Sequence, residues 1–196
     1  MKRILIIFVA LGLAGLALIK AVDRRPSDAN APSYEEALAM TSSLAVPWMP
    51  VGGAEEELAL GRMKELWADL SVGNVRQNLA SVYADDVWFY DTIRTITNLV
   101  ELEHYMVETA ERVDGCSVEF HEVMRTENGY FIRWHMVIDP SIGPENDTWK
   151  SWGISHFRFN REGRIILHHD YWDSGQGFYE NLPGTRWILR NVRARL

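Results

Sequence analysis

The chain has 196 residues, of which 47% are hydrophobic and 24% are charged, and its formal net charge is −7. This composition supports one packed domain and excludes a chain that is disordered throughout. The charge is unevenly spread, because residues 26–185 hold 26 of the 27 acidic but only 11 of the 20 basic residues. An acidic body between basic ends argues against a nucleic-acid partner, and the single cysteine, Cys116, excludes an internal disulfide.

The N-terminus carries an uncharged apolar run over residues 4–19, preceded by two basic residues. Extended past Lys20, the run predicts a transmembrane helix over 4–22. A cleaved signal peptide is the alternative, so residues 1–22 are assigned to a membrane anchor or signal segment. We expect a single-pass protein whose soluble domain lies outside the cytoplasm, although the similar charges of the two flanks barely discriminate the orientation.

Residues 23–52 are rich in proline, glycine and serine, which is typical of a linker. Ser33, followed by two glutamates and an apolar run, predicts one short helix inside this linker. At the other end of the chain, residues 182–196 form a separate segment in which Thr185 begins a basic amphipathic helix. Two interpretations of that helix stay open, since it can lie on an anionic membrane or pack its apolar side on the domain.

The folded body is assigned to residues 53–181. Apolar residues recur at helical spacing over 54–70, 74–83 and 99–113. Aromatic and β-branched runs predict strands at 87–91, 117–125, 130–139, 148–160 and 164–172. Helices followed by consecutive strands indicate an α+β fold, with three helices packed on a curved, mainly antiparallel sheet that encloses a pocket.

Two motifs in this body resemble those of a known superfamily. The first runs YADDVWFYD over residues 83–91, and the second runs SHFRFNREGRI over residues 155–165. With the order of elements, they resemble the nuclear transport factor 2-like superfamily, which includes SnoaL-like polyketide cyclases, scytalone dehydratase and ketosteroid isomerase. The resemblance covers roughly residues 54–180 and implies a cone-shaped α+β fold with an internal pocket. It implies no single activity, because this fold carries enzymes and binding proteins alike.

The resemblance to ketosteroid isomerase implies that Asp91 is a general base. The two positions that match its oxyanion donors are Trp67 and Ser155, so steroid isomerisation is disfavoured. A carboxylate at the end of a hydrophobic strand, facing an apolar pocket, would have a raised pKa and serve as a base. The alternative is an aspartate that accepts backbone N–H bonds in the turn before Thr92.

The last strand carries the densest polar chemistry, the sequence HHDYWD over residues 168–173. Strand alternation places His168 and Asp170 on one face, which the resemblance turns toward the pocket. Together with Asp91 they suit proton abstraction next to a carbonyl, dehydration, or activation of water on an epoxide. The alternative is a buried polar network that braces the sheet. No metal site and no cofactor are predicted.

The remaining candidate residues would form the pocket wall and bind a small, mostly apolar molecule. They are Trp67, Tyr90, Tyr105, Trp134, Met136, Ser155, Phe157 and Trp172. Trp88 and Trp152 are expected on the opposite face of the sheet, where an exposed aromatic surface would support a homodimer.

The leading interpretation is thus a membrane-anchored SnoaL-like domain with lyase, isomerase or cyclase chemistry that uses Asp91 with His168 and Asp170. The rival interpretation is a non-catalytic ligand-binding or protein-assembly module at the membrane.

Overall fold

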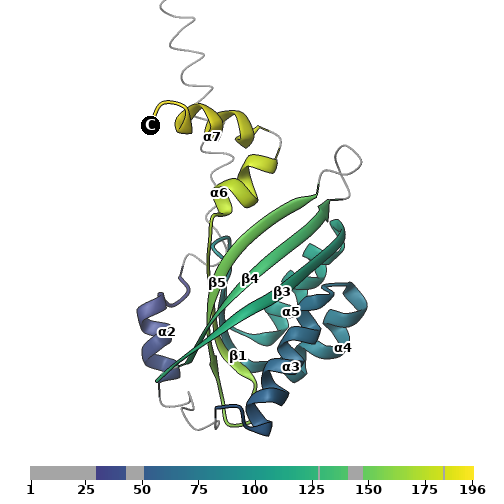
Figure 1. The fold of residues 1–196 in the computed structure, drawn as a ribbon, viewed down its shortest axis with the longest axis vertical. Helices are drawn as coiled ribbons and strands as arrows, with labels where there is room; N and C mark the ends of the chain where they lie inside the picture. The colour runs from purple at the N-terminus through teal and green to yellow at the C-terminus, as the bar shows by residue number, and fades with distance from the viewer. Residues whose placement is uncertain (1–29, 43–50, 128, 141–147, 183) are drawn as a thin grey trace, which may run out of the picture. The chain divides into compact units, whose positions relative to one another are not determined.

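The computed structural model describes part of the chain, and these residues form one compact unit within 31–196 (Figure 1). The described residues are 30–42, 51–127, 129–140, 148–182 and 184–196. The predicted membrane segment over 4–22 lies outside them. In the ranges that are described, no helix combines the length and the apolar character needed to cross a membrane.

A curved, unclosed sheet of six strands forms the framework, in the order β2-β1-β6-β5-β4-β3. The strands are β1 (Tyr83–Tyr90), β2 (Thr95–Ile96), β3 (Val113–Thr126), β4 (Gly129–Pro140), β5 (Trp149–Phe159) and β6 (Ile165–Trp172). Neighbouring strands are antiparallel except β1 and β6, which are parallel. The α+β prediction is therefore confirmed, and the mixed character of the sheet comes from the β1–β6 pair.

Three helices pack on one face of the sheet, as expected (Figure 1). They are α3 (Ala54–Ala68), α4 (Val72–Val82) and α5 (Leu99–Ala110). Their buried residues follow helical spacing, for example Met63 and Leu66 in α3 and Val75 and Leu79 in α4. These side chains form one core with the inward-facing residues of the sheet, which leaves the wider part of the concave face for a cavity.

The other face of the sheet carries a helix from the segment assigned to the linker. Helix α2 (Tyr34–Thr41) starts with a capping box between Ser33 and Glu36, and it packs against β6. Its Ala37 is fully buried, and the carbonyl of Pro32 accepts the indole N–H of Trp88 at 3.0 Å. Trp88 is consequently buried, so the expectation of an exposed Trp88 on this face was wrong.

Polar contacts between α2 and strand β5 hold this helix on the outer face of the sheet. The guanidinium of Arg158 donates to the carbonyl of Leu38 and to the hydroxyl of Thr41, and Tyr34 shares a 2.7 Å hydrogen bond with His156. His169 lies under Tyr34, and burial lowers the pKa of this histidine to about 4.

The outer face also carries exposed aromatic side chains, among them Tyr171 and Trp152, which is 55% exposed. It stacks with His121 and His135, and Arg133 lies 5.3 Å from its ring. The homodimer through this face stays a prediction.

The C-terminal segment continues from β6 through short helices to α7. They are α6 (Ser174–Gly177), the 3-10 helix η1 (Tyr179–Asn181) and α7 (Thr185–Arg193). Arg193 ties α7 to the preceding segment by ion pairs with Glu180 at 2.5 Å and Asp173 at 3.0 Å. Ile188 and Val192 are each more than half exposed, whereas Trp187 of the same helix lines the cavity, and both interpretations of the tail stay predictions.

Candidate functional site

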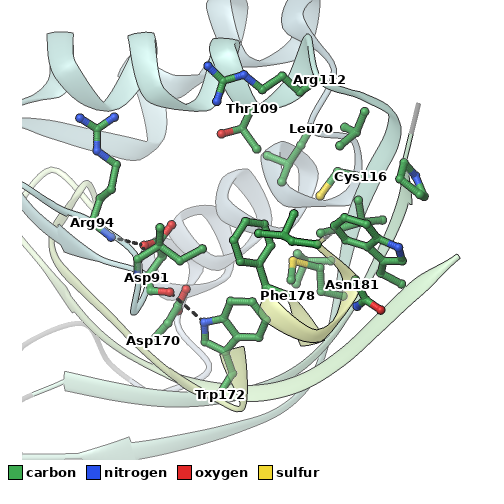
Figure 2. A pocket seen from close by; sticks show the side chains of 18 of the residues that line it. Leu70, Asp91, Arg94, Thr109, Arg112, Cys116, Asp170, Trp172, Phe178 and Asn181 are labelled. Carbon is green, nitrogen blue, oxygen red and sulfur yellow. Dashed lines mark hydrogen bonds between the residues drawn. The ribbon is translucent and has the colours of Figure 1, made fainter. Parts of the chain in front are cut away.

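A cavity of about 1290 Å³ opens between the concave face of the sheet, helix α5 and the C-terminal segment. Figure 2 shows its interior, where aromatic and aliphatic side chains surround a few polar groups. The polar side chains include Asp91, Asp170, His168 and Ser155. An apolar enclosure with a small number of polar groups is the usual form of a small-molecule site.

Asp91 follows directly after β1 and is fixed by a tight turn. Its Oδ1 accepts the backbone N–H groups of Ile93 and Arg94, both at 2.9 Å, so the expected turn is present. Its Oδ2 accepts the hydroxyl of Tyr105 on α5 at 2.5 Å. The carbonyl of Asp91 accepts the indole N–H of Trp172 at 2.8 Å, which links this turn to β6 (Figure 2). The carboxyl group therefore serves the turn and also borders the cavity.

Thr92, inside this turn, has a φ of +73° and is the one described non-glycine residue in the left-handed region. A β-branched residue there carries backbone strain of about 1–3 kcal/mol. Its hydroxyl is also buried without a hydrogen-bond partner among the described residues. Strain of this kind is typically found at functional sites, and here it lies next to the carboxyl group of Asp91.

The environment of Asp91 favours its protonated form. Burial raises the pKa of this carboxyl group above its usual value, and the negative charge of Asp170 raises the pKa further. The hydrogen bonds from Tyr105 and the turn lower the pKa but only in part offset the burial. Burial and the nearby Asp91 also raise the pKa of the Tyr105 phenol, which keeps that hydroxyl protonated as a donor.

The second polar centre is a hydrogen-bonded chain along β6 and its neighbours. Oδ1 of Asp170 lies 2.7 Å from Nε2 of His168 and accepts a short hydrogen bond from Ser155. On the other side of the imidazole, Nδ1 of His168 lies 2.8 Å from the hydroxyl of Tyr83. The indole N–H of Trp67 donates to that hydroxyl at 3.0 Å.

Part of this chain has a fixed hydrogen-bond direction. Trp67 can only donate, so the Tyr83 hydroxyl accepts its indole N–H. The two contacts of His168, with Tyr83 at Nδ1 and with Asp170 at Nε2, take donor and acceptor roles that depend on the tautomer of the imidazole. Trp134 likewise donates to Ser155 at 2.6 Å, and Ser155 donates to Asp170. Both branches end on Oδ1 of Asp170.

The structure brings the three predicted catalytic residues to one cavity. Asp91, His168 and Asp170 all line it, whereas His169 and Tyr171 contact Tyr34 on the other face of the sheet. This is the facing that strand alternation predicts. His168 and Asp170 are both buried, at 2% and 8% exposure, and the catalytic roles of all three residues stay predictions.

Most of the predicted wall residues also line the cavity. They are Trp67, Tyr105, Trp134, Met136, Ser155 and Trp172. Tyr90 does not line the cavity. Side chains alternate along a strand, so Phe89 and Asp91 face the cavity while Tyr90 faces the other side of the sheet and contacts His169. Phe157 lies on the inner face but is fully buried in the core against His168, so it supports the site from behind.

Sequence reasoning missed two groups of lining residues. Arg94 and Arg112 flank α5, and their side chains are labelled in Figure 2 beside the cavity. The C-terminal segment adds Phe178, Asn181, Leu182, Arg186, Trp187 and Arg190. The position of Arg94 three residues after Asp91 was a usable signal, whereas the return of the C-terminal segment to the cavity depends on tertiary structure alone.

Cys116 also lines the cavity, but burial raises the pKa of its thiol to about 12, which disfavours a thiolate nucleophile. In the described part of the chain, no three His, Cys, Asp or Glu side chains gather in a way that would hold a metal ion. The polar side chains that line the cavity include carboxyl groups, an imidazole, hydroxyls and guanidinium groups.

Comparisons with known proteins agree with this architecture. The sequence profile of the SnoaL-like domain family matches residues 63–168, more than half of the chain. A search of curated proteins found no match. Similar solved structures include an epoxide hydrolase of the LEH-like type from M. tuberculosis, with 16% identity and a TM-score of 0.53 over 71% of this chain and 92% of that one.

Two further structures show the same fold. TsrD from Streptomyces laurentii has 12% identity and a TM-score of 0.52, over 66% of this chain and 96% of that one. A nuclear transport factor 2-like protein of unknown function from Exiguobacterium sp. 255-15 has 15% identity and a TM-score of 0.50, over 59% and 98%. At these identities the structural likeness concerns the fold alone.

Proposed function

Because this chain belongs to the SnoaL-like domain family of the nuclear transport factor 2-like superfamily, we propose that it catalyses proton transfer on a small apolar carbonyl compound. The observation that carries the proposal is the pair of carboxyl groups in one apolar cavity, Asp91 with a raised pKa and Asp170 with two hydrogen-bond partners. Many isomerase, lyase and cyclase reactions of carbonyl compounds begin with such a step.

Asp91 is the proposed base. Its carboxylate takes a proton from the carbon next to the carbonyl, the C–H electron pair forms the enolate, and the protonated Asp91 can return the proton to another carbon. A raised pKa makes this aspartate a stronger base than an exposed one and lets it hold the proton between the two steps. Asp170 supports it, since its negative charge contributes to that raised pKa.

The hydrogen-bonded chain from Trp67 and Trp134 holds Asp170 in a defined position. Tyr105 does the same for Oδ2 of Asp91. A polar site whose members are already oriented loses little energy to reorganisation when a proton moves. This preorganisation favours catalysis over simple packing of polar groups.

The test uses exchange of hydrogen for deuterium on 2-tetralone, an apolar bicyclic ketone, followed by proton NMR in D₂O. We expect the wild-type protein to accelerate exchange next to the carbonyl, and Asp91→Asn to lose about 100-fold of that acceleration. Asp170→Asn should lose a smaller part of the acceleration than Asp91→Asn does. Asp86→Asn, an exposed carboxylate on the same strand as the Asp91 turn, is the matched control and should leave the rate unchanged.

The rival function is ligand binding without catalysis, and the same experiment separates the two. It is supported by the fact that both oxygens of Asp91 already accept hydrogen bonds, as in a structural aspartate. Binding of 2-tetralone without any acceleration of exchange would favour the rival and remove the proposed base.

We also propose that this activity is located at a membrane, outside the cytoplasm. The support is the apolar run over 4–22 in the sequence and the exposed apolar residues Ile188 and Val192 of α7.

A further inference from the structure

Four arginines line the solvent-exposed part of the cavity. Arg94 and Arg112 stand on either side of α5, and Arg186 and Arg190 lie one turn apart on the same side of α7. Three of them are exposed and Arg94 is half-buried. In Figure 2, the guanidinium of Arg94 points away from Asp91 and toward α5, where it lies 5.3 Å from the ring of Tyr105.

Little negative charge opposes these arginines. Apart from the two aspartates, Glu108 is the one acidic residue among the described residues that line the cavity. It lies 3.8 Å from Arg112 in an exposed pair, which is a weak interaction. Arg186 uses Nε for the carbonyl of Glu180, and the side chain of Arg190 has no partner in the described ranges.

This positive mouth stands out against the charge of the body. Residues 26–185 hold 26 acidic and 11 basic residues, and two of these basic residues, Arg94 and Arg112, line the same cavity as Arg186 and Arg190 of the basic tail. A cleft lined by one sign of charge and walled by apolar groups concentrates the field on whatever enters it. The mouth therefore attracts anions, while the carboxyl groups in the interior repel them.

We propose that the natural ligand is an amphiphile with an anionic group at one end, held by Arg186 and Arg190, and an apolar body that reaches toward Asp91. A guanidinium binds a carboxylate, sulfonate or phosphate through two parallel hydrogen bonds. The cavity exceeds the ordinary range of about 300–1,000 Å³ for small-molecule sites, which gives room for an extended body. This inference rests on the proposed function, because it names the ligand class of the same cavity.

The test compares two fluorescent probes that differ only by one anionic group. They are N-phenyl-1-naphthylamine, which is neutral, and 8-anilinonaphthalene-1-sulfonate, which carries a sulfonate on the same rings. Titrated into the full-length protein in 50 mM NaCl, the sulfonate probe should bind about tenfold more tightly and displace the neutral one. This advantage should shrink in 500 mM NaCl, because exposed charges are screened by salt.

Arginine variants test which side chains bind the sulfonate group of the probe. Arg186→Gln combined with Arg190→Gln should weaken binding of the sulfonate probe about tenfold and leave the neutral probe unchanged. Arg195→Gln is the matched control just after the same helix, since Arg195 is exposed and does not line the cavity. It should change neither affinity.

The outcomes separate this inference from the proposed function. If the neutral probe binds but the sulfonate gives no advantage, no displacement, or no response to the double variant, the anionic ligand class is overturned and the apolar cavity stands. If neither probe binds, the ligand class is overturned, and the proposed function is decided separately by the exchange of hydrogen on 2-tetralone.

Discussion

At the scale of one residue, the carboxyl group of Asp91 both stabilises a turn and borders the cavity. Oδ1 closes the turn through two backbone N–H bonds, which leaves Oδ2 for Tyr105 and the cavity. The residue after it, Thr92, holds a strained left-handed conformation. The two interpretations of Asp91 that the sequence left open are thus compatible, and its catalytic role stays a prediction.

The raised pKa of Asp91 has a consequence for stability. Between the ordinary carboxyl pKa near ~4 and the higher folded value, the folded state binds a proton that the unfolded state has lost, so stability falls as pH rises through this window. Asp91→Asn removes that titration. We expect the free energy of unfolding of the variant, relative to wild type, to increase as pH rises from ~4 to ~7.

Urea unfolding of both proteins across this pH range measures the difference. Asp86→Asn is the control, and its difference from wild type should stay flat. A relative stability of Asp91→Asn that declines with pH would show that Asp91 is a stabilising carboxylate and not a destabilised one.

Residue positions on strands were largely predictable, because side chains alternate between the faces of a sheet. The facing of His168 and Asp170 follows from that rule, and so does the exclusion of Tyr90 once Asp91 faces inward. The hydrogen-bonded chain through Tyr83 was not predictable, because residues 83 and 168 meet only through the pairing of β1 with β6.

At the scale of elements, α7 presents different residues to its two sides. Arg186 and Arg190 line the cavity, whereas Ile188 and Val192 fall on the opposite side at 100° per residue and are exposed. Exposed apolar residues beside arginines are typical of helices that lie on anionic membranes.

We therefore expect Ile188→Ser and Val192→Ser, each alone, to weaken binding to vesicles that contain phosphatidylglycerol by about tenfold. Co-sedimentation of residues 31–196, which form one compact unit, measures this without the predicted membrane segment. Val100→Ser on α5 is the matched control, since Val100 is 80% exposed and lies away from α7. Equal binding to vesicles of pure phosphatidylcholine would argue against an anionic surface as the partner.

Element boundaries could be predicted to within a few residues wherever apolar spacing and caps agree. Helix α3 begins at Ala54, as its three following glutamates indicate, and α2 begins after its Ser33 cap. What the sequence could not show is where α2 packs. Its contact with β6 buries Trp88, and an amphipathic pattern does not identify the surface that it covers.

At the scale of the whole molecule, one buried carboxylate joins the helical layer to the sheet. Glu56 on α3 is 1% exposed and accepts two 2.7 Å bonds from Arg125 of β3, with a third from Tyr130 of β4 at 3.0 Å. The Arg125 guanidinium is the main cause that lowers the pKa of Glu56 to about 2. This contact holds together the layers that enclose the cavity.

We expect Glu56→Gln to lower the free energy of unfolding at pH 7 by about 1–3 kcal/mol, because Arg125 loses a charged partner. As pH falls from ~4 toward 2, the unfolded state takes up the proton first, so this stabilisation disappears and the two proteins converge. Thermal unfolding across this range measures it. Glu57→Gln, an exposed neighbour, should behave like wild type throughout, and a constant deficit for Glu56→Gln down to pH 2 would contradict the assignment.

The central claim is that Asp91 moves a proton inside the cavity, and the pH dependence of exchange on 2-tetralone tests it most directly. If Asp91 is the base, the second-order rate constant of the protein-catalysed exchange should rise with pH and level off above the raised pKa of that carboxyl group. Asp91→Asn should lose both the rise and the acceleration, while Asp86→Asn keeps them. An Asp91→Asn protein that exchanges 2-tetralone with the wild-type rate and pH profile would contradict the account.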